Sequence, residues 1–161
     1  MTTDIEATRT AMRRRARLMK VANGPMRLLL SLPVPTPLSR RLMVVTHVGR
    51  RTGRQYQQPV SYVRDGDTLL TPGGGRWTRN LVEDQPVELR LTGRRVSARP
   101  ELVGDADEVE RLLRIMVEHN PRLASFVPFV GADGRIDGPT LRRAVEAGFR
   151  VVRWHVDGER R

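Results

Sequence analysis

Short runs of β-branched and other apolar residues, many with a period of two, follow one another from residue 42 onward. This pattern constrains the fold more than any other feature. The runs cover residues 42–48, 56–64, 68–71, 87–91, 96–103 and 149–156. Runs of this length and composition are typical of strands with one buried face. They predict about six short strands.

Turn residues join neighbouring runs. Asp65-Gly66 lies between the second and third runs, and Thr92-Gly93-Arg94 lies between the fourth and fifth. Both are typical of the connection in an antiparallel hairpin. Pro59 lies inside the second run, which predicts a sheet edge or a bulge there, because proline cannot donate to a ladder. Six such strands are enough to close a small barrel and leave no exposed edge.

Helical patterns return after the fifth run. Asp105 can cap a helix whose apolar stripe falls at positions 109, 112, 113 and 116, with Glu108 closing a capping box. A second helix is expected over residues 139–147, ended by Gly148. Because the helices lie at both ends of the chain rather than between strands, we predict an α+β fold with an antiparallel barrel, not a doubly wound sheet.

The N-terminal region differs in charge and pattern. The 161-residue chain has a net charge of +11, and residues 1–54 hold 12 Lys and Arg against 2 Asp and Glu. Residues 5–21 have the periodicity of a basic amphipathic helix, and prolines at 33, 35 and 37 predict an extended linker. We therefore divide the chain into a basic helix with a proline-rich linker, residues 1–37, and a barrel domain, residues 38–161.

The positive charge indicates an anionic partner: a phosphorylated cofactor, an anionic lipid surface or nucleic acid. Nucleic acid is not expected, because aromatic residues are only 4% of the chain, too few for a stacking platform. The basic helix predicts reversible association with anionic membranes, the alternative being that it packs on the barrel. Zero cysteines and no long apolar run fit a cytoplasmic protein, associated with the cytoplasmic face of a membrane where that helix binds lipid.

Two glycine-bearing loops combine backbone amides with arginines. Residues 49–54 follow the first predicted strand, and residues 72–76 follow the third. Glycine lets the main chain approach a ligand and arginine binds phosphate oxygens bidentately, so the pair suits a phosphorylated ligand. Neither loop has the sequence of a P-loop or of the dinucleotide fingerprint, and each alone is also explained as a solvated turn.

Side chains with evident catalytic roles are absent. The three histidines are far apart and there is no cysteine, so no metal site is signalled. No Gly-x-Ser-x-Gly elbow occurs either. Trp77 directly after the second loop can flank a planar ring or belong to the core, and Asn80 can satisfy a nearby backbone group. We leave the catalytic residues unassigned.

The motifs and their order resemble a known family. They are Thr46-His47-Val48-Gly49 with the loop after it, Gln58-Pro59, residues 65–67, Gly74-Gly75 and residues 77–81. Over residues 40–104 this series resembles the deazaflavin-dependent nitroreductase family. The resemblance implies a split β-barrel like that of FMN-binding flavin reductases. It also implies coenzyme F420, a 5-deazaflavin with a phosphate and an acidic polyglutamate tail.

The resemblance further implies positions around the cofactor. Residues of the first loop, which would hold the phosphate and tail, are Arg50, Arg51, Thr52 and Gly53. Residues that would lie beside the deazaflavin ring or wrap around it are Gln58, Pro59, Gly73, Gly74, Gly75, Arg76, Trp77 and Asn80. The region from residue 119 to 129 lacks the tyrosines that line the substrate side in the nitroreductase type. There we expect His119, Phe126 and Phe129.

These features together predict an F420-dependent oxidoreductase. Reduced deazaflavin would pass a hydride from C5 to an electron-poor small molecule: a quinone, an enone or a nitro compound. Because the cofactor carries the chemistry, the protein needs no acid–base pair of its own. Two alternatives stay open: a reductase that uses FMN on the same barrel, and a non-enzymatic basic module that binds membranes or nucleic acid.

Overall fold

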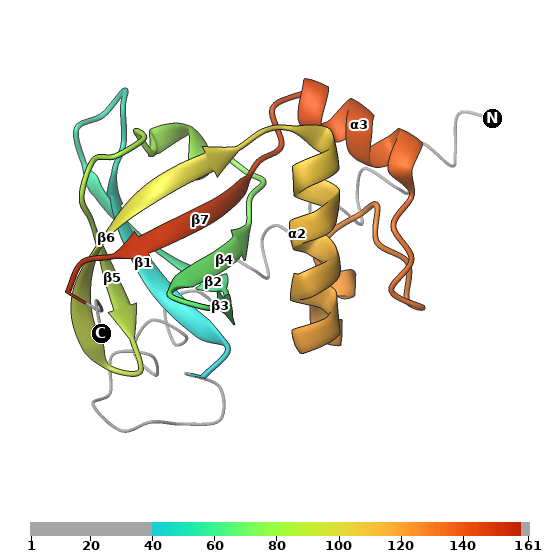
Figure 1. Cartoon of the computed structure of the whole chain (residues 1–161). Helices are drawn as coiled ribbons and strands as arrows, with labels where there is room; N and C mark the ends of the chain where they lie inside the picture. The colour runs from blue at the N-terminus through green and yellow to red at the C-terminus, as the bar shows by residue number, and fades with distance from the viewer. Residues whose placement is uncertain (1–39, 159–161) are drawn as a thin grey trace, which may run out of the picture.

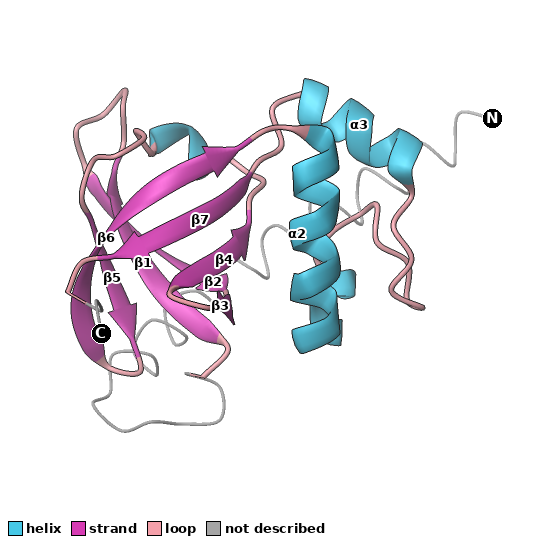
Figure 2. Cartoon of the chain, viewed as in Figure 1, coloured by secondary structure: helices cyan, strands magenta, loops and turns pink. Residues whose placement is uncertain are grey.

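The computed structural model describes residues 40–158 (Figure 1), in which seven strands form one antiparallel sheet. The strands are β1 (Leu42–Val48), β2 (Gln55–Ser61), β3 (Val63–Asp65), β4 (Thr68–Pro72), β5 (Val87–Leu91), β6 (Arg94–Val103) and β7 (Val151–Val156). Their order in the sheet is β2-β1-β5-β6-β7-β4-β3, and the sheet curls strongly (Figure 2). This arrangement, with α-helices beside the sheet, is the predicted α+β class and is consistent with a split barrel.

The prediction of six strands is wrong by one, because the second predicted strand breaks at Tyr62. The Tyr62 N–H still donates to the carbonyl oxygen of Arg41 at 3.0 Å, which continues the β1–β2 register by one residue before the chain changes partner. β2 then pairs with β1, and β3 pairs with β4. The two ends of the sheet order are therefore joined by a single residue. Within residues 40–158 no ladder joins β2 to β3, so the curled sheet keeps two edges, unlike the closed barrel that the sequence predicted.

β2 is an edge strand, as Pro59 predicts. Pro59 lies opposite Val44, and within residues 40–158 the only ladder partner of β2 is β1. The missing N–H of proline is therefore on the side that needs no donor. One side of β2 is left free to border a cavity.

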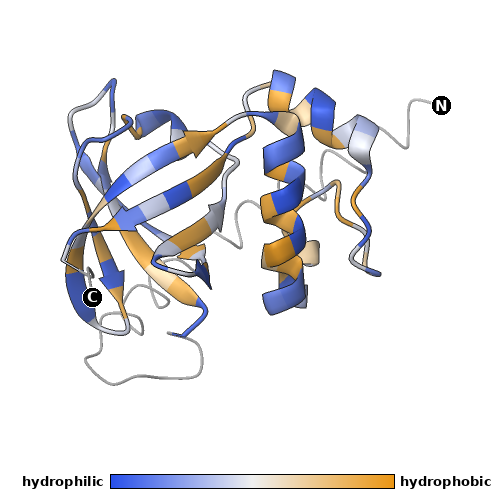
Figure 3. Ribbon diagram, in the orientation of Figure 1, coloured by the Kyte–Doolittle hydropathy of each residue, from blue (hydrophilic) through white to orange (hydrophobic). Residues whose placement is uncertain are grey.

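Buried apolar residues form two clusters. Hydrophobic and hydrophilic residues alternate in bands along the strands (Figure 3). Inside the curled sheet Met43, Leu69, Leu89 and Trp154 are fully buried. The Trp154 indole N–H donates to Thr71 Oγ1 at 3.0 Å, which satisfies the polar atom of this large side chain. The second cluster lies between the sheet and the helices.

The helices begin near the predicted residues. Asp105 caps α2 (Ala106–His119) by accepting from the Glu108 N–H at 2.9 Å. The Glu108 carboxylate instead accepts hydrogen bonds from Arg111 and Arg153, so we find the cap but not the reciprocal half of the capping box. α3 (Gly138–Glu146) is capped by Asp137. Two short 3-10 helices, η1 (Thr78–Asn80) and η2 (Pro121–Ser125), complete the elements of the described chain.

The predicted basic helix, the proline-rich linker and the membrane contact assigned to them fall on residues 1–39, outside the described residues. The domain division at residue 37 therefore stays a prediction. Within residues 40–158, no helix combines the length and the apolar character needed to cross a bilayer.

Candidate functional site

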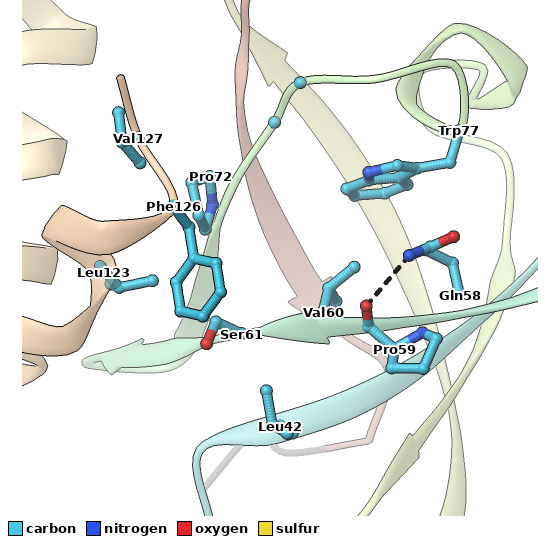
Figure 4. Close-up of a pocket in the computed structure, with 12 residues that line it drawn as sticks. Leu42, Gln58, Pro59, Val60, Ser61, Pro72, Trp77, Leu123, Phe126 and Val127 are labelled. Atoms are coloured by element: carbon cyan, nitrogen blue, oxygen red, sulfur yellow. Dashed lines mark hydrogen bonds between the residues drawn. The ribbon is translucent and has the colours of Figure 1, made fainter. Parts of the chain in front are cut away.

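A cavity of about 280 Å³ lies beside the free edge of β2 (Figure 4). Its walls come from the start of β1, from β2, from the end of β4 with the loop after it, from Trp77, and from η2 with the residues that follow. The lining residues are Leu42, Gln58, Pro59, Val60, Ser61, Pro72, Gly73, Gly74, Trp77, Leu123, Phe126 and Val127.

The lining has aromatic rings at its two ends and a neutral wall between them. Trp77 and Gln58 lie at one end, and Phe126 and Ser61 lie at the other (Figure 4). The Gln58 side-chain amide donates to the carbonyl oxygen of Pro59 at 3.2 Å, which holds it below the indole. No described residue in the lining is ionisable. The cavity therefore suits a flat, neutral, largely apolar group.

The glycine-rich loop after β4 is shaped by backbone contacts. The Gly73 N–H donates to the carbonyl oxygen of Arg150 at 2.8 Å, and a Cβ at position 73 would lie 1.9 Å from that oxygen. Only glycine fits there. Gly74 and Gly75 have φ of +118° and +88°, conformations that other residues rarely adopt. The loop thus turns tightly over the cavity and leads into Trp77.

The loop between β1 and β2 presents positive charge. It is closed by two backbone hydrogen bonds of 2.8 Å between Gly49 and Arg54 and between Gly53 and Gly49. The side chains of Arg50 and Arg51 are exposed and form no ion pair with a described carboxylate. Arg76 in the second loop is likewise exposed and without an ion pair among residues 40–158. Unneutralised guanidinium groups attract anions such as phosphate.

Asn80 connects η1 to the loop between β1 and β2. The Arg50 N–H donates to Asn80 Oδ1 at 3.2 Å, so the prediction that Asn80 satisfies a backbone group is confirmed. Asn80 Nδ2 lies 3.2 Å from His47 Nδ1. Burial lowers the pKa of His47 below its ordinary value. His47 was not among the predicted site residues, although it lies in the Thr46-His47-Val48-Gly49 motif on which the family resemblance rests.

The structure separates the predicted site residues into three groups. Those that line the cavity are Gln58, Pro59, Gly73, Gly74, Trp77 and Phe126. Those that belong to the two loops or to η1 without lining it are Arg50, Arg51, Thr52, Gly53, Gly75, Arg76 and Asn80. Those that do neither are His119 and Phe129.

On the expected substrate side, only Phe126 lines the cavity, and 61% of its surface is exposed. Phe129 is buried in the helical cluster and packs edge-to-face on Phe149 at 5.0 Å. The core takes its ring because the chain turns inward after η2. His119 is exposed, with its Nδ1 2.8 Å from the carbonyl oxygen of Ile115. Neither His119 nor Phe129 therefore lines this cavity, where the sequence led us to expect them.

Sequence reasoning missed half of the lining. The missed residues are Leu42, Val60, Ser61, Pro72, Leu123 and Val127. Most are apolar, and an apolar residue has the same sequence pattern whether it faces a core or a cavity.

Comparison with known protein families found a match to one family model. Residues 11–128 match the family model described as F420H(2)-dependent quinone reductase. No curated protein sequence matches the chain. Among solved structures, an F420-H2 dependent reductase, FDR-A, is 13% identical, with a TM-score of 0.48 over 71% of this chain and 94% of that one. The heme storage protein HutZ from Vibrio cholerae is 14% identical, with a TM-score of 0.49 over 73% of this chain and 82% of that one.

Proposed function

We propose that this chain, which belongs to the F420H(2)-dependent quinone reductase family, reduces a neutral quinone in the cavity between Trp77 and Phe126. Membership in that family makes the chain an oxidoreductase with coenzyme F420 as its cofactor. The predicted dependence on F420 is thereby confirmed, in preference to the FMN-dependent and non-enzymatic alternatives. The choice among quinone, enone and nitro compound is our proposal.

The described residues fit the cofactor's chemistry. Arg50 and Arg51 would bind the phosphate and the acidic tail. Their guanidinium groups are exposed and form no ion pair with a carboxylate of residues 40–158. Trp77 and the Gln58-Pro59 pair would bracket the flat ring, because the indole lies above that pair at the same end of the cavity (Figure 4). When bound, reduced F420 supplies a hydride from C5 of its ring.

The neutral wall is the observation that favours a quinone. Hydride addition leaves negative charge on the acceptor, and no described lining residue is a general acid able to neutralise it. In a quinone that charge lies on a phenolate oxygen and is delocalised into the aromatic ring, and a proton from water completes the hydroquinone. An enolate is less well delocalised, and reduction of a nitro group needs protons to release water. Both of these acceptors depend more on a positioned acid.

Apolar side chains from η2 and the residues after it would hold the acceptor ring. Leu123 and Val127 are buried at the base of this wall, whereas Phe126 is largely exposed at its end. An exposed aromatic ring beside a cavity gains contact area when a ring binds against it. The Ser61 hydroxyl at the same end is the group best placed to donate to an acceptor oxygen (Figure 4).

Acceptor specificity tests the proposal. The purified protein is supplied with reduced F420, and oxidation of the cofactor is followed by absorbance with a naphthoquinone, its sulfonated analogue, a cyclic enone and a nitroaromatic compound. We expect the neutral naphthoquinone to give the highest kcat/KM, with the sulfonate at least about tenfold lower, because the wall offers its charge no partner. Equal or faster turnover of the enone or the nitro compound would contradict the assignment.

A matched pair of variants locates the acceptor. Phe126→Ala should raise KM for the naphthoquinone and leave the Kd of F420 unchanged. The control is Val82→Ala, which shortens another exposed apolar side chain away from the cavity. If both variants behave like the wild type, the acceptor does not bind against Phe126.

A further inference from the structure

His47 is a buried imidazole just before an exposed, arginine-bearing loop. It is the penultimate residue of β1 and only 7% exposed, whereas the next residue, Val48, is 55% exposed. Its ring stacks on Tyr56, its partner across the β1–β2 ladder, with centroids 5.7 Å apart and planes at 24°. The imidazole of His47 is therefore both buried and held by its stack on Tyr56.

The hydrogen bonds of Asn80 determine the state of that imidazole. Because a backbone N–H can only donate, the amide atom facing Arg50 is the oxygen, at 3.2 Å. The amide nitrogen then faces His47 Nδ1, also at 3.2 Å, and must donate to it. His47 is thus neutral, with Nδ1 as the acceptor and the proton on Nε2. The lowered pKa agrees with this state.

The same ring supports a second attachment of the loop. The Tyr56 hydroxyl lies 3.1 Å from Thr52 Oγ1, and Thr52 Oγ1 also accepts from the Arg54 N–H at 3.3 Å. Tyr56 is 42% exposed, and its ring packs on His47 and against Gly49. Two residues of the loop, Arg50 and Thr52, are therefore held through groups that touch His47.

We propose that His47 is a positioning residue for the loop between β1 and β2, acting through Asn80 and Tyr56. With the amide of Asn80 fixed, the Arg50 N–H points inward and the loop is attached to η1, the element that follows Trp77. The inference rests on the proposed binding of the F420 phosphate and tail by Arg50 and Arg51. His47 itself lines no part of the cavity and touches no reacting atom.

The experiment compares two ligands: F420, and the same deazaflavin without its phosphate and tail. His47→Phe keeps the ring and its stack on Tyr56 but removes the acceptor for Asn80. We expect the Kd for F420 to rise about tenfold, the usual scale for one unsatisfied buried donor, and the Kd for the tail-less ligand to stay within about twofold. Binding is measured by fluorescence and folding by thermal melting. The control is His155→Phe, which removes an exposed imidazole on β7.

Two further variants separate positioning from general packing. His47→Asn places an amide oxygen near the position of Nδ1 and should restore most of the affinity. Asn80→Ala should give the same selective loss as His47→Phe, and the double variant should lose no more than Asn80→Ala alone, because the two residues act in series.

Each failure has a distinct meaning. A wild-type chain that binds neither ligand would overturn the proposed function and this inference with it. A wild type that binds F420, with His47→Phe binding it equally tightly or losing both ligands equally, would overturn only the role of His47. If His47→Phe does not fold, Asn80→Ala carries the test, and an equal loss of both ligands by that variant would reject the inference.

Discussion

Gly73 lies directly against the backbone of Arg150: its N–H donates to the Arg150 carbonyl oxygen at 2.8 Å, and an added Cβ would stand 1.9 Å from that oxygen. The contact joins the end of β4 to the residue before β7. It therefore fixes where the glycine-rich loop leaves the sheet and where Trp77 enters the cavity.

Gly73→Ala should accordingly destabilise the protein by about 1–3 kcal/mol, since the backbone must shift to admit the methyl group. Urea unfolding followed by circular dichroism measures the loss. Gly138→Ala is the matched control, because a Cβ there meets no atom within 4 Å, and its stability should be unchanged or slightly raised. Equal stability of the two variants would mean that the β4–β7 contact adjusts freely.

Glu108 joins α2 to the sheet and predicts a dependence of stability on pH. Hydrogen bonds from Arg111 and then Arg153 lower the pKa of its carboxyl group from 4.5 to about 2. Because the pKa is lowered in the folded state, the stabilisation is complete above about pH 4.5 and is lost as pH falls toward 2. The carboxylate is partly open to solvent, so we expect about 1 kcal/mol from it.

Glu108→Gln should therefore unfold about 1 kcal/mol more easily at pH 7 and show a shallower decline of stability between pH 4.5 and 2. Urea titrations at several pH values provide the measurement. Glu110→Gln is the control on the same helix, since Glu110 pairs only with Arg114 at the surface among described residues. Identical pH profiles for wild type and Glu108→Gln would show that other carboxylates determine acid stability.

Local patterns predicted the elements well where local chemistry determines them. The strand over residues 87–91 and the cap at Asp105 agree with the structure because a hairpin turn and an aspartate cap are complete within a few residues. The break at Tyr62 could not be predicted. The run of residues 56–64 is continuous in the sequence, whereas in the structure β2 pairs with β1 and β3 pairs with β4, and no local pattern encodes that change of partner.

The residues of the candidate site also divide into those that local motifs predicted and those that depend on contacts between distant parts of the chain. Gln58 and Trp77 come from recognisable motifs, and both line the cavity. Leu123 and Val127 line it too, but nothing in their pattern distinguishes a cavity wall from a core. The contact between Asn80 and His47 joins residues 33 positions apart. No spacing rule links two such residues before the fold is known.

Arg51→Ala should weaken F420 binding by about 1.5–3 kcal/mol, the scale of a hydrogen bond to a charged group, with little change in stability. Arg51 is exposed in the loop and has no described carboxylate partner. Fluorescence titrations at low and physiological salt give the Kd. The control is Arg94→Ala, at the exposed first residue of β6. An unchanged Kd at both salt concentrations would remove Arg51 from the binding site.

Trp77→Ala should weaken F420 binding by more than its effect on folding explains. The indole packs partly against the barrel cluster and partly lines the cavity, so about 2 kcal/mol of stability should be lost in the free protein, less than for a fully buried ring. The cofactor stabilises the folded state in proportion to its affinity. The loaded protein should therefore lose clearly more stability than the free protein, as thermal melting with and without saturating F420 can measure.

Trp154→Phe is the internal control, because Trp154 is fully buried away from the cavity. This substitution should cost the free and the loaded protein the same amount of stability. If Trp77→Ala also costs both forms the same amount, its ring belongs to the barrel alone and the deazaflavin lies elsewhere.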